Sequence, residues 1–213
     1  MERTITQIVN LTKIRSKIYI NYEFAFILYK AEIKRYKIKL NESISEDNYN
    51  ELVDEVLSKR AKKRCLNLLL SRNYSSSELA KKLSTSYPKE VVDNAIAYVK
   101  SYGYIDDEAY VESYIRCNSC IKSLKRIEYD LQNKGIQRDI INRHMSEFVE
   151  ENDGCEQEII TRILKKKLLS KTNIENIDKK EVDKVKMTLY RKGFSIDSIN
   201  SCINKMKVEY ISH

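Results

Sequence analysis

The sequence predicts a mainly α-helical protein, in which three tandem three-helix modules follow a small N-terminal sheet. Three observations predict this fold. One pattern, a helix, a tight turn and a second helix, recurs in clear form around Leu131–Ile136 and Leu189–Phe194, and a looser copy begins at Leu79. The chain has only four glycines, and two of them occupy the same slot in the clear copies. Residues 1–28 are instead rich in β-branched and aromatic residues, which favour strands.

The N-terminal segment predicts two or three short antiparallel strands, with Ile18 and Ile20 on one face. A sheet of this size is marginal alone, so we expect it to pack on the helices that follow. A short helix is expected near Leu28–Tyr36. Ser45 has the character of a helix N-cap and opens a longer helix. These elements form a first predicted domain, residues 1–57.

From residue 58 onward the apolar residues recur with a helical period, which predicts helical modules at 58–105, 106–153 and 154–213. Ser75–Glu78 has the sequence of a capping box, and Pro88 suits the first turn of the next helix. The third module should contain helices near the following segments: Cys155–Leu169, Asp178–Lys192 and Ser195–Val208. A polar link, Leu169–Ile177, is expected inside that module.

The shared glycine slot predicts a left-handed helix end. Gly135 and Gly193 each follow a lysine, and the residue after each of them is apolar. Glycine enters the left-handed region cheaply, so the helix can end there and the next apolar side chain can pack back on it. Gly103 is expected to close the last helix of the first module. Repeated helical modules present an extended surface, which is typical of proteins that bind a long partner.

Composition favours an anionic partner. The chain has 213 residues, with 39 Lys and Arg against 31 Asp and Glu, and a net charge of +8. Such an excess suits nucleic acid, although a solvated helical surface is the alternative explanation. No run approaches the ~18 apolar residues of a membrane span. Met1–Thr6 also lacks the apolar core of a signal peptide. We therefore expect a cytoplasmic protein, and we expect it to be a monomer.

The residues that usually carry chemistry are scarce. An odd number of cysteines, five, without a secretion signal predicts reduced thiols. Cys117–Cys120 has C-x-x-C spacing, but there is no second pair, and the only histidines are His144 and His213. Asp106–Glu108 suits a helix start better than a magnesium site. The sequence therefore predicts no catalytic residue, no metal and no cofactor.

Three basic clusters are the candidate binding residues. Each can face solvent while the other side of its helix packs, as contact with phosphates or with an acidic protein surface requires. A merely solvated face is an equal alternative for any one of them. The first cluster contains Lys62, Lys63, Arg64 and Arg72, in a basic run that also holds Lys59 and Arg60. The second contains Lys122, Lys125 and Arg126, and the third contains Lys165, Lys166 and Lys167. Tyrosines between Tyr98 and Tyr114 have the chemistry to stack on bases, but their helical spacing favours core packing.

One segment resembles a known family. Gly103–Val111 resembles the Gly-Tyr-[Leu/Ile]-[Asn/Asp]-Asp-x-x-[Tyr/Phe]-[Ala/Val] core of the RecX family of recombinase regulators. Lys122–Ile127 and Lys134–Ile136 are similar to that family's basic helix and its Lys-Gly-Ile turn, and Ser71–Leu83 is similar to its Arg-x-x-Ser-x-x-Glu-Leu-x-x-x-Leu stretch. The family-motif residues are Gly103, Tyr104, Asp106, Asp107, Tyr110, Ile127, Leu131, Gly135 and Gly193. Ser123 stands where the family usually has glycine.

The resemblance implies a non-enzymatic protein of three three-helix modules. Such proteins lie along the groove of the RecA–single-stranded DNA filament and restrain its strand-exchange and coprotease activities in DNA repair and the SOS response. Direct contact with DNA stays open. Two other classes are the alternatives. One is a tandem helix-turn-helix transcription regulator, for which a three-helix unit is the usual scaffold. The other is an enzyme, for which the sequence shows no nucleophile–base set.

Overall fold

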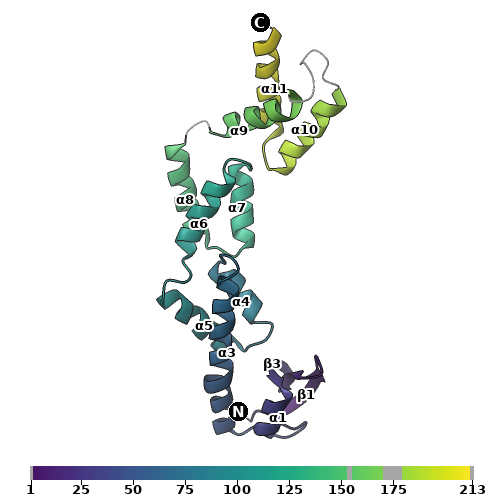
Figure 1. Ribbon diagram of the computed structural model, residues 1–213, viewed down its shortest axis with the longest axis vertical. Coiled ribbons are helices and arrows are strands. Elements are labelled where there is room, and N and C mark those ends of the chain that lie inside the picture. Colours follow the sequence, from purple (N-terminus) through teal and green to yellow (C-terminus); the bar gives the residue numbers. More distant parts are fainter. Residues whose placement is uncertain (1, 153–154, 170–178, 212–213) are drawn as a thin grey trace. The chain divides into compact units, whose positions relative to one another are not determined.

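The computed structural model describes residues 2–152, 155–169 and 179–211, and these residues belong to two compact units, Met1–Asp106 and Asp107–His213 (Figure 1). The predicted fold class is confirmed, since a small N-terminal sheet is followed by helices. The predicted module boundary at 153–154 and the predicted polar link after Leu169 lie outside the described residues. Within those residues, no helix combines the length and the apolar character needed to cross a membrane.

The sheet of unit 1 has three antiparallel strands in the order β1-β2-β3: β1 (Ile5–Asn10), β2 (Arg15–Ile20) and β3 (Glu23–Tyr29). Ile18 on β2 lies opposite Phe26 on β3, and both side chains are buried. The short helix α1 (Lys30–Arg35) follows directly. The sheet packs on the helices, as its small size requires.

A continuous helical rod follows, made of α2 (Glu46–Glu51), η1 (Leu52–Leu57) and α3 (Ser58–Leu69). The Ser45 hydroxyl accepts a hydrogen bond from the Asn48 N–H at 3.4 Å, so Ser45 caps the rod as predicted. η1 has the wider π-helical turn, in which the Ser58 N–H donates to the Val53 carbonyl five residues earlier. The predicted domain boundary after residue 57 falls inside this rod.

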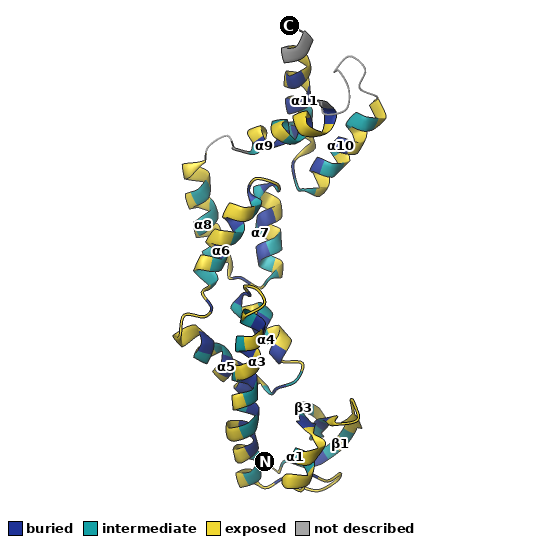
Figure 2. Cartoon of the chain, in the orientation of Figure 1, coloured by how far each residue is buried: buried dark blue, intermediate teal, exposed yellow. Residues whose placement is uncertain are grey.

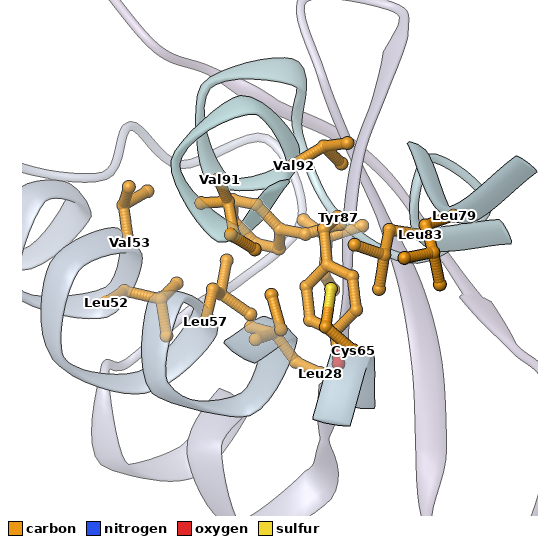
Figure 3. Close-up of a cluster of buried hydrophobic side chains, with 14 of the residues drawn as sticks. Leu28, Leu52, Val53, Leu57, Cys65, Leu79, Leu83, Tyr87, Val91 and Val92 are labelled. Carbon is orange, nitrogen blue, oxygen red and sulfur yellow. The ribbon is translucent and has the colours of Figure 1, made fainter. Parts of the chain in front are cut away.

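Two further helices, α4 (Ser76–Leu83) and α5 (Lys89–Ser101), complete unit 1. Ser75 and Glu78 form the predicted capping box: the Glu78 N–H donates to the Ser75 hydroxyl at 3.1 Å, and the Ser75 N–H donates to the Glu78 carboxylate at 3.3 Å. Pro88 immediately precedes α5. The shared core draws on β3, the rod, α4 and α5 (Figure 3). Its labelled members are Leu28, Leu52, Val53, Leu57, Cys65, Leu79, Leu83, Tyr87, Val91 and Val92.

Unit 2 contains only helices among its described residues. They are α6 (Asp107–Asn118), α7 (Leu124–Asn133), α8 (Arg138–Glu151), α9 (Cys155–Leu164), η2 (Lys165–Leu169), α10 (Lys179–Arg191) and α11 (Ile196–Ile211). α6 to α8 enclose one apolar cluster and α9 to α11 a second (Figure 2). Ile121 follows the end of α6 and is 47% exposed.

The two clusters of unit 2 meet at the start of α7. The Ser123 N–H donates to the Lys192 carbonyl at 3.0 Å, and the Leu124 N–H donates to the Glu156 carboxylate at 2.8 Å. The Ser123 hydroxyl accepts from the Arg126 N–H at 3.2 Å. Ser123 therefore caps α7 and also contacts the turn after α10, which explains why a serine serves in this position.

The predicted left-handed helix ends are confirmed at Gly103, Gly135 and Gly193, where φ is 69°, 72° and 92°. The residue after each glycine donates its N–H to the carbonyl five residues earlier, as at Phe194 and Leu189, which are 3.3 Å apart. The looser copy turns differently and with one residue fewer, since the N–H of buried Tyr87 bonds to a carbonyl only four residues back.

Gly193→Ala should destabilise unit 2 by about 2–4 kcal/mol, which combines left-handed strain with overpacking. A Cβ at this position would lie 2.4 Å from the Ser123 hydroxyl oxygen and 2.7 Å from Arg126 Cβ. Gly103→Ala is the matched control, because φ is also positive there but nothing lies within 4 Å of the new Cβ. We expect that control to lose only about 1 kcal/mol. Urea unfolding measures both, and equal losses would show that the Gly193 contact contributes no packing energy.

Candidate nucleic-acid interface

The first basic cluster is divided between two surroundings. Lys63 and Arg64 are exposed on α3. Lys62 instead places its ammonium 4.9 Å from the Tyr98 ring centroid. Arg72 lies 3.8 Å from the Tyr74 ring and 3.4 Å from the Glu78 carboxylate, so it is held beside the start of α4. Lys63 and Arg64 are thus the members whose charges stay available to a partner.

Lys63 and Arg64 line an open hollow of about 410 Å³ in unit 1, which we call the basic hollow. Five cations line it: Arg15 from β2, Arg60, Lys63 and Arg64 from α3, and Lys82 from α4. Arg60 belongs to the basic run that the sequence already showed. Sequence reasoning did not select Arg15 or Lys82. No local pattern connects Arg15 or Lys82 with α3, because only the tertiary fold brings them there.

Two of the three cations of the second basic cluster form ion pairs within unit 2. The Lys122 ammonium lies 2.8 Å from the Asp130 carboxylate and 3.2 Å from the Tyr114 hydroxyl. Arg126 approaches the other oxygen of Asp130 at 3.1 Å. The expectation that all three cations point outward is therefore wrong for Lys122, because a half-buried carboxylate needs a counter-charge. Lys125 is exposed.

This network shifts the pKa of both main partners. Partial burial acts to raise the pKa of Asp130, but the hydrogen bond and charge of Lys122, together with the charge of Arg126, bring that pKa below its usual value. Burial acts to lower the pKa of Lys122, and its hydrogen bonds with Asp130 and Tyr114 raise that pKa instead. Both groups are thus held in their charged forms.

The third basic cluster lies on η2. Lys165, Lys166 and Lys167 are exposed between the buried side chains of Leu164 and Leu168. Lys166 and Lys167 line a groove of about 520 Å³, which we call the basic groove. Two further lysines from α10 and its C-terminal end complete it, Lys184 and Lys192, and Glu181 is its one acidic lining residue among those described. The α10 lysines are spread along the sequence, so the sequence showed no cluster there.

The family-motif residues mainly form helix ends and cores. Ile127 and Leu131 are fully buried in the cluster of α6 to α8. Asp106 and Asp107 lie where unit 1 ends and unit 2 begins. The expectation of core packing is wrong for Tyr102 and Tyr104, which are 63% and 54% exposed and stack on each other with ring centroids 6.0 Å apart.

The remaining tyrosines follow the expectation more closely. Tyr110 and Tyr114 are half-buried against the core of α6 to α8. Their rings lie 6.2 Å apart, and the Lys134 ammonium is 5.6 Å from each centroid. These two rings are therefore occupied by contacts within unit 2.

A small antiparallel sheet followed by helical modules defines this chain as a helical-repeat protein. It is 28% identical over 197 residues to "Regulatory protein RecX" of Clostridioides difficile (strain 630), which covers 90% of this chain and 89% of that protein. It is 27% identical over 203 residues to "Regulatory protein RecX" of Caldanaerobacter subterraneus, covering 94% and 98%. No protein-family model matches the chain.

Two solved structures share the fold. "Crystal structure of regulatory protein RecX" aligns with a TM-score of 0.56 at 22% identity, over 96% of this chain and 100% of that one. RecX from Lactobacillus salivarius aligns with a TM-score of 0.54 at 24% identity, over 71% and 97%. The nearly full-length sequence matches make this chain similar to proteins named regulatory protein RecX, and the two structures show that it shares their fold.

Asp130→Asn should lower the free energy of unfolding at pH 7 by about 1–2 kcal/mol, because Lys122 loses its counter-charge. The pKa of Asp130 is lowered in the folded state, so its stabilisation is complete above its unfolded pKa of about 3.9 and is lost as pH falls through the folded value. The difference between wild type and variant should therefore shrink toward pH 2.

Urea unfolding at several pH values tests this expectation. Glu112→Gln is the control, since Glu112 pairs with Arg116 four residues away and both side chains are more than half exposed. That change should cost less than about 0.5 kcal/mol. A difference between wild type and Asp130→Asn that stays constant with pH would contradict the assigned role of the ionised carboxylate.

Proposed function

We propose that this protein binds a RecA-type recombinase filament on single-stranded DNA and restrains its strand-exchange and coprotease activities. The observation that carries the proposal is the similarity, over about nine-tenths of the chain, to proteins named regulatory protein RecX. The Gly103–Val111 motif and the basic, Lys-Gly-containing second module add support from the residues themselves.

The distribution of charge fits a long anionic partner. Unit 1 carries the basic hollow and unit 2 carries the basic groove, and each draws cations from more than one element. Separate weak contacts along one chain reinforce each other when the partner is long enough to meet them together. A protein filament assembled on DNA is that long, and its acidic and phosphate groups recur along its length. A small substrate could contact only one of the two basic sites.

The proposal makes the protein a regulator rather than an enzyme, acting as a monomer in the cytoplasm during DNA repair and the SOS response. Its relatives are named regulatory proteins, which supports this choice. Its effect would come from occupying a surface of the filament. Direct contact with DNA strengthens that occupation but is not required for it.

The test is ATP hydrolysis by the recombinase of the same organism on single-stranded DNA, with and without this protein. We expect hydrolysis, and cleavage of the repressor by the filament, to slow at stoichiometric amounts. No effect at an excess would overturn the proposal. Sequence-preferring binding to duplex DNA, with no response to the filament, would favour a transcription regulator instead.

Lys166→Ala combined with Lys167→Ala should weaken inhibition about tenfold or more, because contacts between charged groups are strong. The melting temperature should hardly change, since exposed charges contribute little to stability. Lys205→Ala combined with Lys207→Ala is the matched control, because these lysines are exposed on α11 and do not line the basic groove. Equal weakening by both pairs would mean that net charge, rather than the groove, determines inhibition.

A further inference from the structure

We propose that the basic hollow is a phosphate-binding site that holds a backbone phosphodiester of single-stranded DNA. The choice of DNA as the source of the phosphate rests on the proposed function. The chemistry of the site rests on unit 1 alone. Three features carry it: an unbalanced charge, walls that are fixed before any ligand arrives, and hydroxyl and amide groups beside the cations.

Charge in the basic hollow is unbalanced. None of the described residues that line it is acidic. Of its five cations, Arg60 forms an ion pair with Glu32, which comes from α1. The other four lie around one space of about 410 Å³. Like charges held this close repel each other, and an anion placed among them removes that cost. The hollow is therefore suited to bind an anion.

Arg60 forms a fixed wall of the hollow. Besides its ion pair with Glu32, its guanidinium donates to the Ile27 carbonyl at 3.4 Å and lies 4.8 Å from the Tyr29 ring centroid. Arg60 thus joins α3 to the sheet. Lys63 and Arg64 follow on the same helix face, at three and four residues further, and stay exposed. Their charges face the space that Arg60 borders.

A second wall is the turn between α4 and α5, which supplies Thr85, Ser86 and Tyr87. The Ile27 N–H donates to the Ser86 carbonyl at 3.1 Å, which ties this turn to the sheet. Tyr87 is buried beside Cys65 and Leu83 (Figure 3). Burial raises the pKa of Tyr87, while the nearby charges of Arg60 and Arg64 act in the opposite direction. The buried ring and the tied turn hold this wall in place before a ligand binds, which reduces the entropy lost on binding.

Uncharged polar groups complete the site. Asn67 adds an amide one helical turn beyond Lys63, and that amide can donate to a phosphate oxygen. The Ser86 hydroxyl also lines the hollow and lies 3.4 Å from the Thr85 hydroxyl, whose own proton is donated to the Lys82 carbonyl at 2.9 Å. A phosphodiester has two non-bridging oxygens that accept several hydrogen bonds at once, and guanidinium groups match them in pairs. Groups of this kind read the nucleic-acid backbone and not the base sequence.

The decisive experiment measures binding of fluorescent oligodeoxythymidylate to the full chain without recombinase. Lys63→Ala combined with Lys82→Ala removes two lining cations and leaves Arg60 in place. We expect binding about tenfold weaker or more. The slope of log affinity against log salt should fall by about 1.4, because each phosphate contact to a single strand contributes about 0.7.

Lys81→Ala combined with Lys89→Ala is the matched control. It removes the same charge from unit 1 at two exposed lysines that do not line the hollow. Control and test variants that weaken binding equally would overturn the proposal. The proposal would also be overturned if inorganic phosphate bound in the hollow while the Lys63→Ala, Lys82→Ala variant kept the oligonucleotide affinity of the wild type. If that variant lost filament inhibition but kept its oligonucleotide affinity, the hollow would bind an acidic protein surface, and the proposal would again be overturned.

The outcome is separable from the test of function. Oligonucleotide binding needs no recombinase. If this protein had no effect on ATP hydrolysis but the lysine variant bound the oligonucleotide more weakly, the DNA-binding site would stand and the proposed function would fall. If this protein slowed ATP hydrolysis but Lys63→Ala combined with Lys82→Ala left the oligonucleotide affinity unchanged, the proposed function would stand and the phosphate site would fall.

Discussion

The helical modules depend on how their second helix ends. Where α7 and α10 stop, a glycine in the left-handed region lets the next residue return its N–H to the same helix, and its side chain then closes the core. Ile136 and Phe194 are both buried in this way. Without that reversal the third helix would leave the second, and the apolar stripes of both would stay in water. The module containing Tyr87 reaches the same packing with a shorter turn, so what recurs is the buried residue rather than one backbone conformation.

The same modules decide which cations remain free for a partner. Lys122, Arg60 and Arg72 are each held by a carboxylate inside their own unit. Lys63 and Lys166 instead lie beside open space with few acids around it. Net charge therefore says less about binding than the position of each acidic neighbour does. The half-buried carboxylate of Asp130 forms ion pairs with Lys122 and Arg126, so these two cations stabilise the fold and are less available to a partner.

Sequence reasoning predicted the elements that depend on neighbours in the chain. Helix caps at Ser45 and Ser75, the strands before Tyr29 and the glycine-ended helices all follow from local chemistry. The prediction that the Lys122 ammonium faces solvent was wrong, because its partner Asp130 is eight residues further along the chain, beyond the N-cap of α7.

The basic hollow was only partly visible for a similar reason. Its α3 cations lie within five consecutive residues of the sequence, Arg60 to Arg64. Arg15 comes close to them only because β2 pairs with β3 and the sheet packs on α3. Hydrophobic periodicity reports which face of an element is buried. It does not report which distant element covers it, and so the site could be assembled only from the folded chain.

The π-helical turn in the rod decides where this protein can change in length. Leu52 and Leu57 are both fully buried, although residues five apart on a regular α-helix point about 140° away from each other. The wider turn brings them to one side. Deleting one residue between them would leave the two leucines four apart on a regular α-helix, about 40° from each other, so they would still face the same core. A deletion elsewhere in the rod would instead rotate the two flanking segments by about 100° relative to each other. During evolution, loss of a single residue should therefore be tolerated better at this turn than elsewhere in the rod.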